Sequence, residues 1–244
     1  MSARGAALLL IGNELLAGKV HDVNLPALAR VLRELGVPLR RAVLVPDERA
    51  TIAAEVNALR AAHDVVFTSG GVGPTHDDVT LAAVADAFGV ELAPHPEVAR
   101  LVRAHFGPRT SEGHLAMALL PVNAELRGAP GVDWPATVVG NVWVLPGLPE
   151  AFADKLTVIA HHLAPGPAIV SRAVTTWLDE GTLKPHLDAV VAAFPDVDVG
   201  SYPTWSDPTH HVKLTFDGTD PARLDAAADA LVARLPPGQA TRVG

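Results

Sequence analysis

The chain has 244 residues, 49% of them hydrophobic, no cysteine and a formal net charge of −8. The absence of cysteine excludes disulfides, thiolate metal sites and cysteine nucleophiles, and the negative charge argues against a broad nucleic-acid-binding surface. No apolar run approaches the ~20 residues of a membrane span, and the N-terminal residues lack the form of a signal peptide. We therefore expect a cytoplasmic protein with neither a nucleic-acid nor a membrane partner.

Short apolar runs alternate with helical patterns in the first part of the chain. Apolar runs that end at glycine, proline or aspartate predict buried strands, and apolar residues three and four apart that stop at glycine predict helices. The alternation predicts an α/β fold with a mostly parallel sheet and helices on both faces. In chain order we expect a strand over 6–11, a helix over 25–35, a strand over 37–45, a helix over 51–62, a strand over 65–67, helices over 79–88 and 97–106, a loop over 107–113, a helix over 114–120, a short edge strand over 125–126, an irregular section over 128–135, a strand over 142–145 and a helix over 150–163.

A Pro-Gly-Pro sequence at 165–167 predicts a boundary between two domains, 1–165 and 166–244. The second stretch is short and has the pattern of a small α+β domain in the order β-α-β-β-α. We expect residues 238–244 to form a loose tail. The elements expected in this domain are a strand over 168–177, a helix over 181–194, strands over 197–202 and 211–216, and a helix over 222–235.

The stretch over 65–80 contains the clearest candidate for a binding site. Its apolar strand is followed by glycines at 70, 71 and 73, and then by a helical pattern. A strand, a glycine-rich turn and a helix in this order present backbone N–H groups that can bind an anion, and glycine lets a ligand approach the main chain. An ordinary strand-to-helix turn with Thr75 or Asp77 as the N-cap is the alternative explanation.

Two adjacent carboxylates, Asp77 and Asp78, follow the glycines. Beside a phosphate-sized pocket they would repel an anion unless a cation lay between them, so they predict Mg²⁺ or a similar hard metal ion. The acidic bias of a first helical turn is the alternative. His76 in the same loop is a candidate phosphate contact or acid-base group, and a solvated loop histidine is an equal alternative.

Ligands of open α/β sheets bind beyond the carboxyl ends of the strands, and four strand ends here carry polar or turn residues. Carboxylates, hydroxyls and backbone amides at one edge fit a phosphorylated ligand with a bridging cation. The chain has neither a Walker A loop nor the Gly-x-Ser-x-Gly elbow of hydrolases. The residues expected at this edge are Gly12, Asn13, Glu14, Pro46, Asp47, Thr68, Ser69, Gly70, Gly71, Gly73, Pro74, Thr75, Asp77, Asp78, Thr80, Pro146 and Gly147.

The segment over 68–80 resembles the Gly-Gly-x-Gly-Pro-Thr-x-Asp-Asp-x-Thr signature of the molybdopterin-binding domain. This domain occurs in the competence/damage-inducible CinA family and in the N-terminal part of eukaryotic FAD synthases, and MogA and MoaB proteins carry a close variant. The segments over 145–150 and 200–203 are similar to the family's Leu-Pro-Gly-Val-Pro-x-Glu sequence and to part of the small domain of CinA-like proteins.

A further resemblance lies near the N-terminus. The segment over 12–18, with Asn24 after it, resembles the family's Gly-Asp-Glu-Ile-Leu-x-Gly segment and the asparagine that follows it. In this chain Asn13 replaces the usual acidic residue. The resemblance implies a MogA/MoaB-like three-layer α/β/α domain, a small α+β domain after it, and a homodimer. It also implies functional roles for Asp78 and Asp47.

CinA-type domains are associated with metal-dependent hydrolysis of nucleotide pyrophosphates, so the leading hypothesis is a pyrophosphatase assisted by Mg²⁺ or Co²⁺, with K⁺ as a further candidate ion. Asp77 and Asp78 would hold the metal, and Glu14 or Asp47 would serve as base or as support for it. One alternative is a molybdopterin-binding or adenylylating protein, and another is a protein that binds a nucleotide without turnover, as Asn13 hints. The candidate ligand-binding residues are Gly12, Asn24, Ser69, Gly70, Gly71, Gly73, Pro74, Thr75, His76, Thr80, Pro146 and Gly147.

Overall fold

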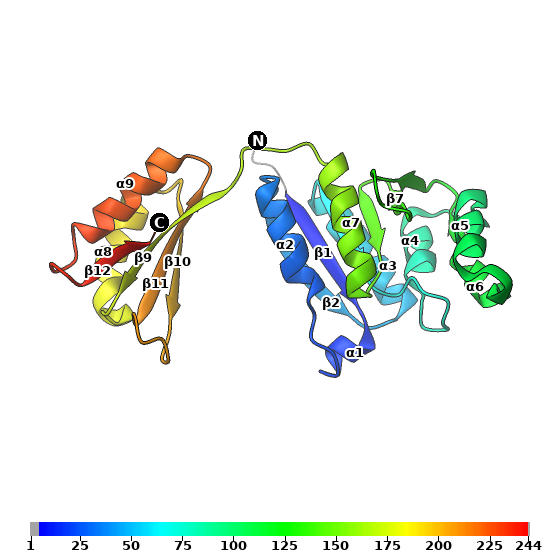
Figure 1. The fold of residues 1–244 in the computed structure, drawn as a ribbon, viewed down its shortest axis with the longest axis horizontal. Coiled ribbons are helices and arrows are strands. Elements are labelled where there is room, and N and C mark those ends of the chain that lie inside the picture. The colour runs from blue at the N-terminus through cyan, green and yellow to red at the C-terminus, as the bar shows by residue number, and fades with distance from the viewer. Residues whose placement is uncertain (1–4, 244) are drawn as a thin grey trace. The chain divides into compact units, whose positions relative to one another are not determined.

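The structure is a computed structural model that describes residues 5–243. Its internal contacts divide the chain into two units, Met1–Gly166 and Pro167–Gly244, both drawn in Figure 1. The elements of the first unit are β1 (Ala6–Ile11), α1 (Asn13–Leu16), α2 (Asn24–Glu34), β2 (Leu39–Val45), α3 (Arg49–Ala62), β3 (Val65–Ser69), α4 (Thr80–Phe88), β4 (Leu92–Pro94), α5 (Pro96–Phe106), a 3-10 turn (Gly107–Arg109), α6 (Glu112–Ala116), β5 (Leu119–Pro121), β6 (Glu125–Arg127), β7 (Ala136–Val139), β8 (Val142–Leu145) and α7 (Pro149–His162).

The main sheet of the first unit has the strand order β2-β1-β3-β8-β7-β6. Strands β2, β1, β3 and β8 are parallel, whereas β7 and β6 are antiparallel to their neighbours. Leu10 of β1 pairs with Ser69 of β3, and Ser69 pairs with Leu145 of β8. The carboxyl ends of the four parallel strands therefore lie at one edge of the sheet, which confirms the mostly parallel sheet that the sequence predicted.

Strand β1 is buried along its whole length. Leu8 and Leu10 belong to a core shared with helices α2 and α7, whereas Leu9 and Ile11 belong to a core shared with α3 and α4. Successive side chains of a strand point to opposite faces, so an uninterrupted apolar run is what a strand covered on both faces requires. The result is the expected three-layer α/β/α arrangement (Figure 1).

The helix expected over 114–120 is wrong in its second half, and the first unit contains three strands that were not predicted. The expected helix over 114–120 ends at Ala116, and Leu119–Pro121 is instead a strand that pairs with β4. Proline disfavours the helical region for the residue before it, so the residue before Pro121 adopts an extended backbone. Strands β4 and β7 are the other two without a predicted counterpart.

The second unit is an antiparallel sheet with the strand order β10-β11-β9-β12 and two helices that share its core. The expected loose tail is wrong for residues 240–243, which form β12 and pair with the free edge of β9, while residue 244 lies outside the described residues. The small α+β domain is confirmed, with one strand more than predicted. Its elements are β9 (Val170–Thr176), α8 (Glu180–Ala193), β10 (Asp198–Pro203), β11 (Val212–Gly218), α9 (Pro221–Val232) and β12 (Ala240–Val243).

The helices are short for the width of a bilayer. Helices α3, α7 and α8 have 14 residues each, whereas a membrane span needs about 20. Across residues 5–243, no helix combines the length and the apolar character that crossing a membrane requires.

Candidate functional site

Asn24 joins three elements at the carboxyl edge of the main sheet. It is the first residue of α2 and only 5% exposed. Its Nδ2 donates a hydrogen bond to Ser69 Oγ at 2.9 Å and another to the carbonyl oxygen of Gly147 at 2.9 Å. Buried amides are rarely left without partners, so this pair of bonds fixes the start of α2 against the ends of β3 and β8. The structure thus brings together Asn24, Ser69 and Gly147, which come from three of the sequence segments that resemble the family.

The turn after β3 requires glycine at two positions. Gly70 has φ 113° and Gly71 has φ 65°, a region that residues with a Cβ avoid. A Cβ on Gly70 would collide with the carbonyl oxygen of Ile11, and one on Gly71 would collide with the Thr80 hydroxyl. The buried Thr80 closes the turn, because its Oγ1 donates to the Gly70 carbonyl at 2.8 Å and its N–H donates to the Gly71 carbonyl at 2.9 Å.

The backbone amide of Gly70 is already used within the sheet. Its N–H donates to the carbonyl oxygen of Leu145 at 3.2 Å, which ties the end of β3 to the end of β8. The same contact brings Gly147 so close that a Cβ there would lie 3.1 Å from Gly70 Cα. The amides of Gly71 and Gly73 are therefore better placed than that of Gly70 to receive an anion.

The carboxylates of Asp77 and Asp78 converge on the hydroxyl of Thr75. Thr75 Oγ1 lies 2.7 Å from Asp77 Oδ1 and also makes a short hydrogen bond with Asp78 Oδ2, which in turn accepts the Thr75 N–H at 2.8 Å. A hydroxyl has one proton to donate, so the two carboxylates share it. The hydrogen bond from Thr75 holds the pKa of Asp77 below its usual value, and ionised carboxylate oxygens are the ligands that hard cations prefer.

The two explanations of this segment as an ordinary helix start are wrong. Helix α4 begins at Thr80, its N-cap is Val79, and no side chain caps it. Asp78 bonds to the backbone of Thr75 inside the loop, and neither Thr75 nor Asp77 acts as the cap. The acidic pair therefore precedes the first helical turn and belongs to the loop over 70–78.

Asp47 and Glu14 lie at the ends of β2 and β1 and have different surroundings. Asp47 Oδ2 accepts the backbone N–H of Asn13 at 2.7 Å, so this carboxylate holds α1 against β2. The Glu14 carboxylate lies against Gly12, where an added Cβ would collide with it. Glu14 lines a cavity at this edge and Asp47 does not; Asp47 instead positions the backbone.

A small cavity of about 70 Å³ opens beside these residues. It is lined by Glu14, Asn24, Ser69 and Gly147, which the sequence predicted, and by His21 and Asp22, which it did not. Among the described residues of its wall, the titratable ones are two carboxylates and one histidine. An anionic ligand that approaches here would meet negative charge unless a cation accompanies it.

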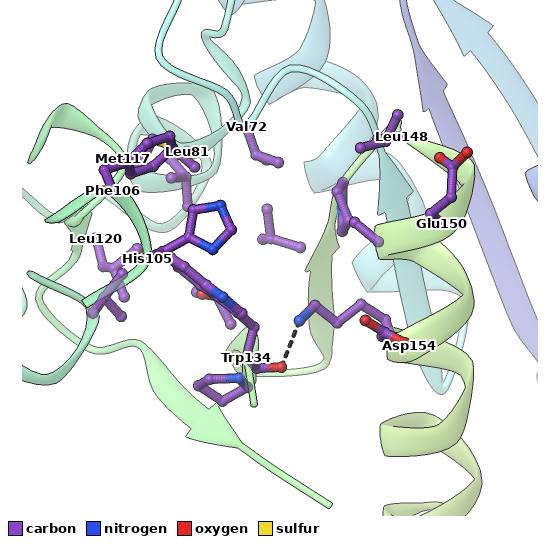
Figure 2. A pocket seen from close by; sticks show the side chains of 17 residues that line it. Val72, Leu81, His105, Phe106, Met117, Leu120, Trp134, Leu148, Glu150 and Asp154 are labelled. Atoms are coloured by element: carbon purple, nitrogen blue, oxygen red, sulfur yellow. Dashed lines mark hydrogen bonds between the residues drawn. The ribbon is translucent and has the colours of Figure 1, made fainter. Parts of the chain in front are cut away.

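A larger cavity of about 600 Å³ lies at the same end of the unit (Figure 2). Val72 of the glycine-rich loop and both neighbours of Gly147, Pro146 and Leu148, contribute to its wall. The other side is formed by α5, α7 and the segment around Trp134. In the part of the chain that the structure describes, neither cavity has Asp77 or Asp78 in its wall.

The larger cavity contains a buried charged group that the sequence analysis missed. Lys155 is 7% exposed, and its Nζ donates to the carbonyl oxygen of Trp134 at 2.5 Å. Burial lowers the pKa of Lys155 to about 8. A signal was present, because Lys155 lies three residues after the buried Phe152 and three before the buried Val158, on the helix face that enters the core.

The family model described as a probable molybdopterin binding domain matches residues 7–165. The chain belongs to this family. A second model, the FAD synthase middle domain, matches residues 168–243. The pair of matches accounts for both units of the structure, and it agrees with the fold class that the sequence predicted.

Two relatives and one solved structure are similar to this molybdopterin-binding-domain protein over most of its length or most of theirs. A probable FAD synthase from Caenorhabditis briggsae is 31% identical over 93% of this chain and 48% of that protein. A CinA-like protein from Anaeromyxobacter dehalogenans is 33% identical over 88% of this chain and 55% of that protein. The chain therefore spans about half the length of these two relatives. The crystal structure of the protein CinA with unknown function from Thermoplasma acidophilum matches with a TM-score of 0.60 and 26% identity over 66% of this chain and 98% of that one, and the predicted CinA relationship is confirmed.

The remaining predicted residues of the molybdopterin-binding domain lie on the exposed part of the loop. Pro74 is exposed, and the His76 side chain is 97% exposed with its Nδ1 3.8 Å from Asp77 Oδ1. A Cβ on Gly73 would lie 2.7 Å from Asp78 Oδ2. Within residues 5–243, no three His, Asp or Glu side chains are grouped to hold a metal ion by themselves. A cation at Asp77 and Asp78 would take its other ligands from phosphate and water, as Mg²⁺ commonly does.

Proposed function

We propose that the N-terminal domain binds a nucleotide-like diphosphate such as ADP-ribose or FAD and hydrolyses its pyrophosphate bond with the help of a divalent cation. The observation that carries the proposal is the sharing of the Thr75 hydroxyl by Asp77 and Asp78. Two carboxylates that share one hydroxyl repel each other unless a cation or proton compensates, and Asp77 keeps a low pKa. The family match and the FAD synthase relative support a small phosphorylated ligand.

The residues of this chain have separate tasks in the proposed reaction. Asp77 and Asp78 would hold the cation, and the N–H groups of Gly71 and Gly73 would donate to a phosphate oxygen. A bound Mg²⁺ or Co²⁺ would neutralise phosphate charge and lower the pKa of a water molecule. Asn24 would fix the ends of β3 and β8 that support the loop. Glu14 would accept the proton of the attacking water, since Asp47 is already bonded to the backbone of Asn13.

The products define the test. Attack of water on one phosphorus breaks the P–O bond of the bridge and gives two phosphomonoesters: AMP and ribose 5-phosphate from ADP-ribose, or AMP and FMN from FAD. The protein is incubated with each compound and Mg²⁺ or Co²⁺, with and without K⁺, and the products are separated by chromatography. Asp78→Asn should lower the rate by about 100-fold or more.

A matched control comes from the second unit. Asp207 Oδ1 likewise accepts hydrogen bonds from both the hydroxyl and the N–H of a threonine, Thr209. Asp207 has no role in the proposed reaction. Asp207→Asn should therefore turn over like wild type. Equal turnover by Asp78→Asn and wild type would contradict the proposal.

A second candidate function rests on the family match itself. The matched family is described as a probable molybdopterin binding domain, so a protein that binds or adenylylates molybdopterin would use the same loop. Calorimetry with molybdopterin and with ADP-ribose separates the two functions. If ADP-ribose binds and raises the melting temperature but no product forms, the third hypothesis, a nucleotide-binding protein without turnover, is favoured.

A further inference from the structure

The 600 Å³ cavity lies next to the glycine-rich loop, because residues of that loop and of the turn around Gly147 form part of its wall. Val72, which lines it, lies between Gly71 and Gly73, the two residues whose N–H groups are proposed to bind a phosphate. Pro146 and Leu148 line it from either side of Gly147. A ligand whose phosphates reach these glycine turns therefore has the mouth of the cavity within one residue of each turn.

The walls of the cavity are mostly apolar and include aromatic rings. Figure 2 shows Val72, His105, Trp134 and Leu148 around a common space. The rings of His105 and Trp134 meet edge to face with centroids 5.9 Å apart. The volume falls within the range of roughly 300–1,000 Å³ that small-molecule sites occupy. Such walls suit a flat ring system better than a sugar or a phosphate, which would leave polar groups without partners.

Lys155 supplies a hydrogen-bond donor inside these mostly apolar walls. The other titratable side chains of the wall are His105, Glu150 and Asp154, and the charge of Asp154 opposes the effect of burial on the pKa of Lys155. Its ammonium group has three N–H donors, and the structure gives one acceptor, the carbonyl oxygen of Trp134 at 2.5 Å. Lys155 is 93% buried, being 7% exposed, and burial lowers its pKa to about 8. A buried ammonium is stabilised by each further acceptor that it meets, and heterocycles carry such acceptors as carbonyl oxygens or ring nitrogens.

We infer that this cavity binds the planar heterocycle of the same diphosphate ligand, with Lys155 donating to a carbonyl oxygen or ring nitrogen of that heterocycle. The inference rests on the proposed function, because it takes the ligand to be a dinucleotide-like diphosphate. The shared chemistry is a flat, largely apolar ring system with an acceptor at its edge, which both a purine and a flavin provide. Lys155 thereby becomes a residue that selects the ligand and plays no part in the bond cleavage.

The test fills the cavity and removes its ammonium group. Ala151 lines the cavity from α7 at a partly exposed position, so Ala151→Trp occupies the space with little risk to folding. Ala160→Trp is the matched control, because Ala160 is an exposed residue of the same helix outside the wall. Lys155→Met keeps the apolar stem and removes the charge. Calorimetry at low temperature with Mg²⁺ measures binding of FAD, ADP-ribose, adenosine, riboflavin and inorganic pyrophosphate.

We expect Ala151→Trp to weaken binding of FAD or ADP-ribose at least tenfold and to leave pyrophosphate binding unchanged, with Ala160→Trp equal to wild type. Lys155→Met should weaken the same ligands and remove the loss of affinity that wild type shows as the pH rises through about 8. Adenosine and riboflavin identify the heterocycle, since only the fragment that enters the cavity should be sensitive to Ala151→Trp.

The failures of the inference and of the proposed function differ. If Asp78→Asn loses pyrophosphate while Ala151→Trp and Lys155→Met bind FAD and ADP-ribose as wild type does, the inference is overturned and the proposed function stands. If wild type binds FAD or ADP-ribose with the sensitivity to Ala151→Trp and Lys155→Met given above but forms no product, the proposed hydrolysis is overturned and the inference stands. If wild type binds none of the five compounds, both are overturned.

Discussion

Asn24 donates a hydrogen bond to Ser69 at 2.9 Å across 45 positions of the sequence, and both groups are buried. The same amide reaches the Gly147 carbonyl, so one side chain ties a helix start to two strand ends. Removal of the amide leaves the buried Ser69 hydroxyl without this donor, which costs about 1–3 kcal/mol in the free energy of unfolding. The candidate site therefore depends on a residue that is itself largely shielded from solvent.

Asn24→Ala should lower the free energy of unfolding by about 1–3 kcal/mol, measured by urea denaturation. Asn57→Ala is the control, because Asn57 is an exposed residue that bonds to a neighbour on its own helix, and its loss should change stability by no more than about 0.5 kcal/mol. Equal stability of the two variants would show that the buried link adds nothing to the fold.

Gly71→Ala should destabilise the first unit by more than about 1 kcal/mol, because the backbone is left-handed there and the new methyl group would collide with the Thr80 hydroxyl. Gly128→Ala is the control, since no atom lies within 4 Å of a Cβ at that position. Thermal unfolding measures both. A Gly71→Ala protein as stable as Gly128→Ala would contradict the geometry of this turn.

The Thr75 hydroxyl lowers the pKa of Asp77, so its removal should raise that pKa toward the ordinary value. In Thr75→Val, affinity for the cation should therefore fall at a higher pH than in wild type as the solution is acidified. Thr75→Ser retains the hydroxyl and should follow wild type. Titration of the Asp77 carboxyl carbon by NMR measures the shift directly, and an identical titration in all three proteins would exclude the hydrogen bond as its cause.

The pKa of Lys155 is about 8 in the folded protein and 10.5 in the unfolded chain. The unfolded state therefore binds more protons between these values, and the stability of wild type should rise with pH across this window. Below pH 8 the cost of burying the charge is present in full. The rise should be on the order of 2 kcal/mol after allowance for screening.

Lys155→Met should lack this rise, whereas Lys184→Met should keep it, because Lys184 is an exposed residue paired with Asp188. Urea denaturation at pH 7, 8, 9 and 10 compares the three proteins. A rise of the same size in Lys155→Met would assign the pH dependence to another group.

Local patterns in the sequence were enough to predict the layers of the first unit. The run over β1 is apolar at every position, so its alternate residues supply the two cores. The end of α4 at Gly89 follows from the left-handed backbone of that glycine, φ 63°. Strand β7 was missed although a signal existed, since Gly140 and Asn141 separate two apolar runs as a two-residue hairpin loop does. Strand β12 has four residues that are mostly exposed, and its pairing with β9 gives it a structure.

In the candidate site, too, local sequence patterns predict some features, whereas others depend on contacts between distant segments. The loop over 70–78 is contiguous in the chain, so its glycines and carboxylates could be recognised from sequence. The larger cavity combines Phe106, Trp134 and Lys155 from three separated segments, and their convergence depends on how α5 and α7 pack. Asn24 was named from the resemblance alone, and the structure supplies the physical reason, a pair of hydrogen bonds to strands far along the chain.

The close approach of Gly70 and Gly147 leaves no room for a side chain between the two turns, since a Cβ on Gly147 would lie 3.1 Å from Gly70 Cα. The two turns therefore form one continuous ridge of main chain, and a side chain at Gly147 would push against the turn at Gly70. Attempts to redirect this protein toward a different compound must leave the ridge untouched and vary the residues on its flanks. Val72 and Leu148 are the natural places to begin, because both line the cavity beside the two turns.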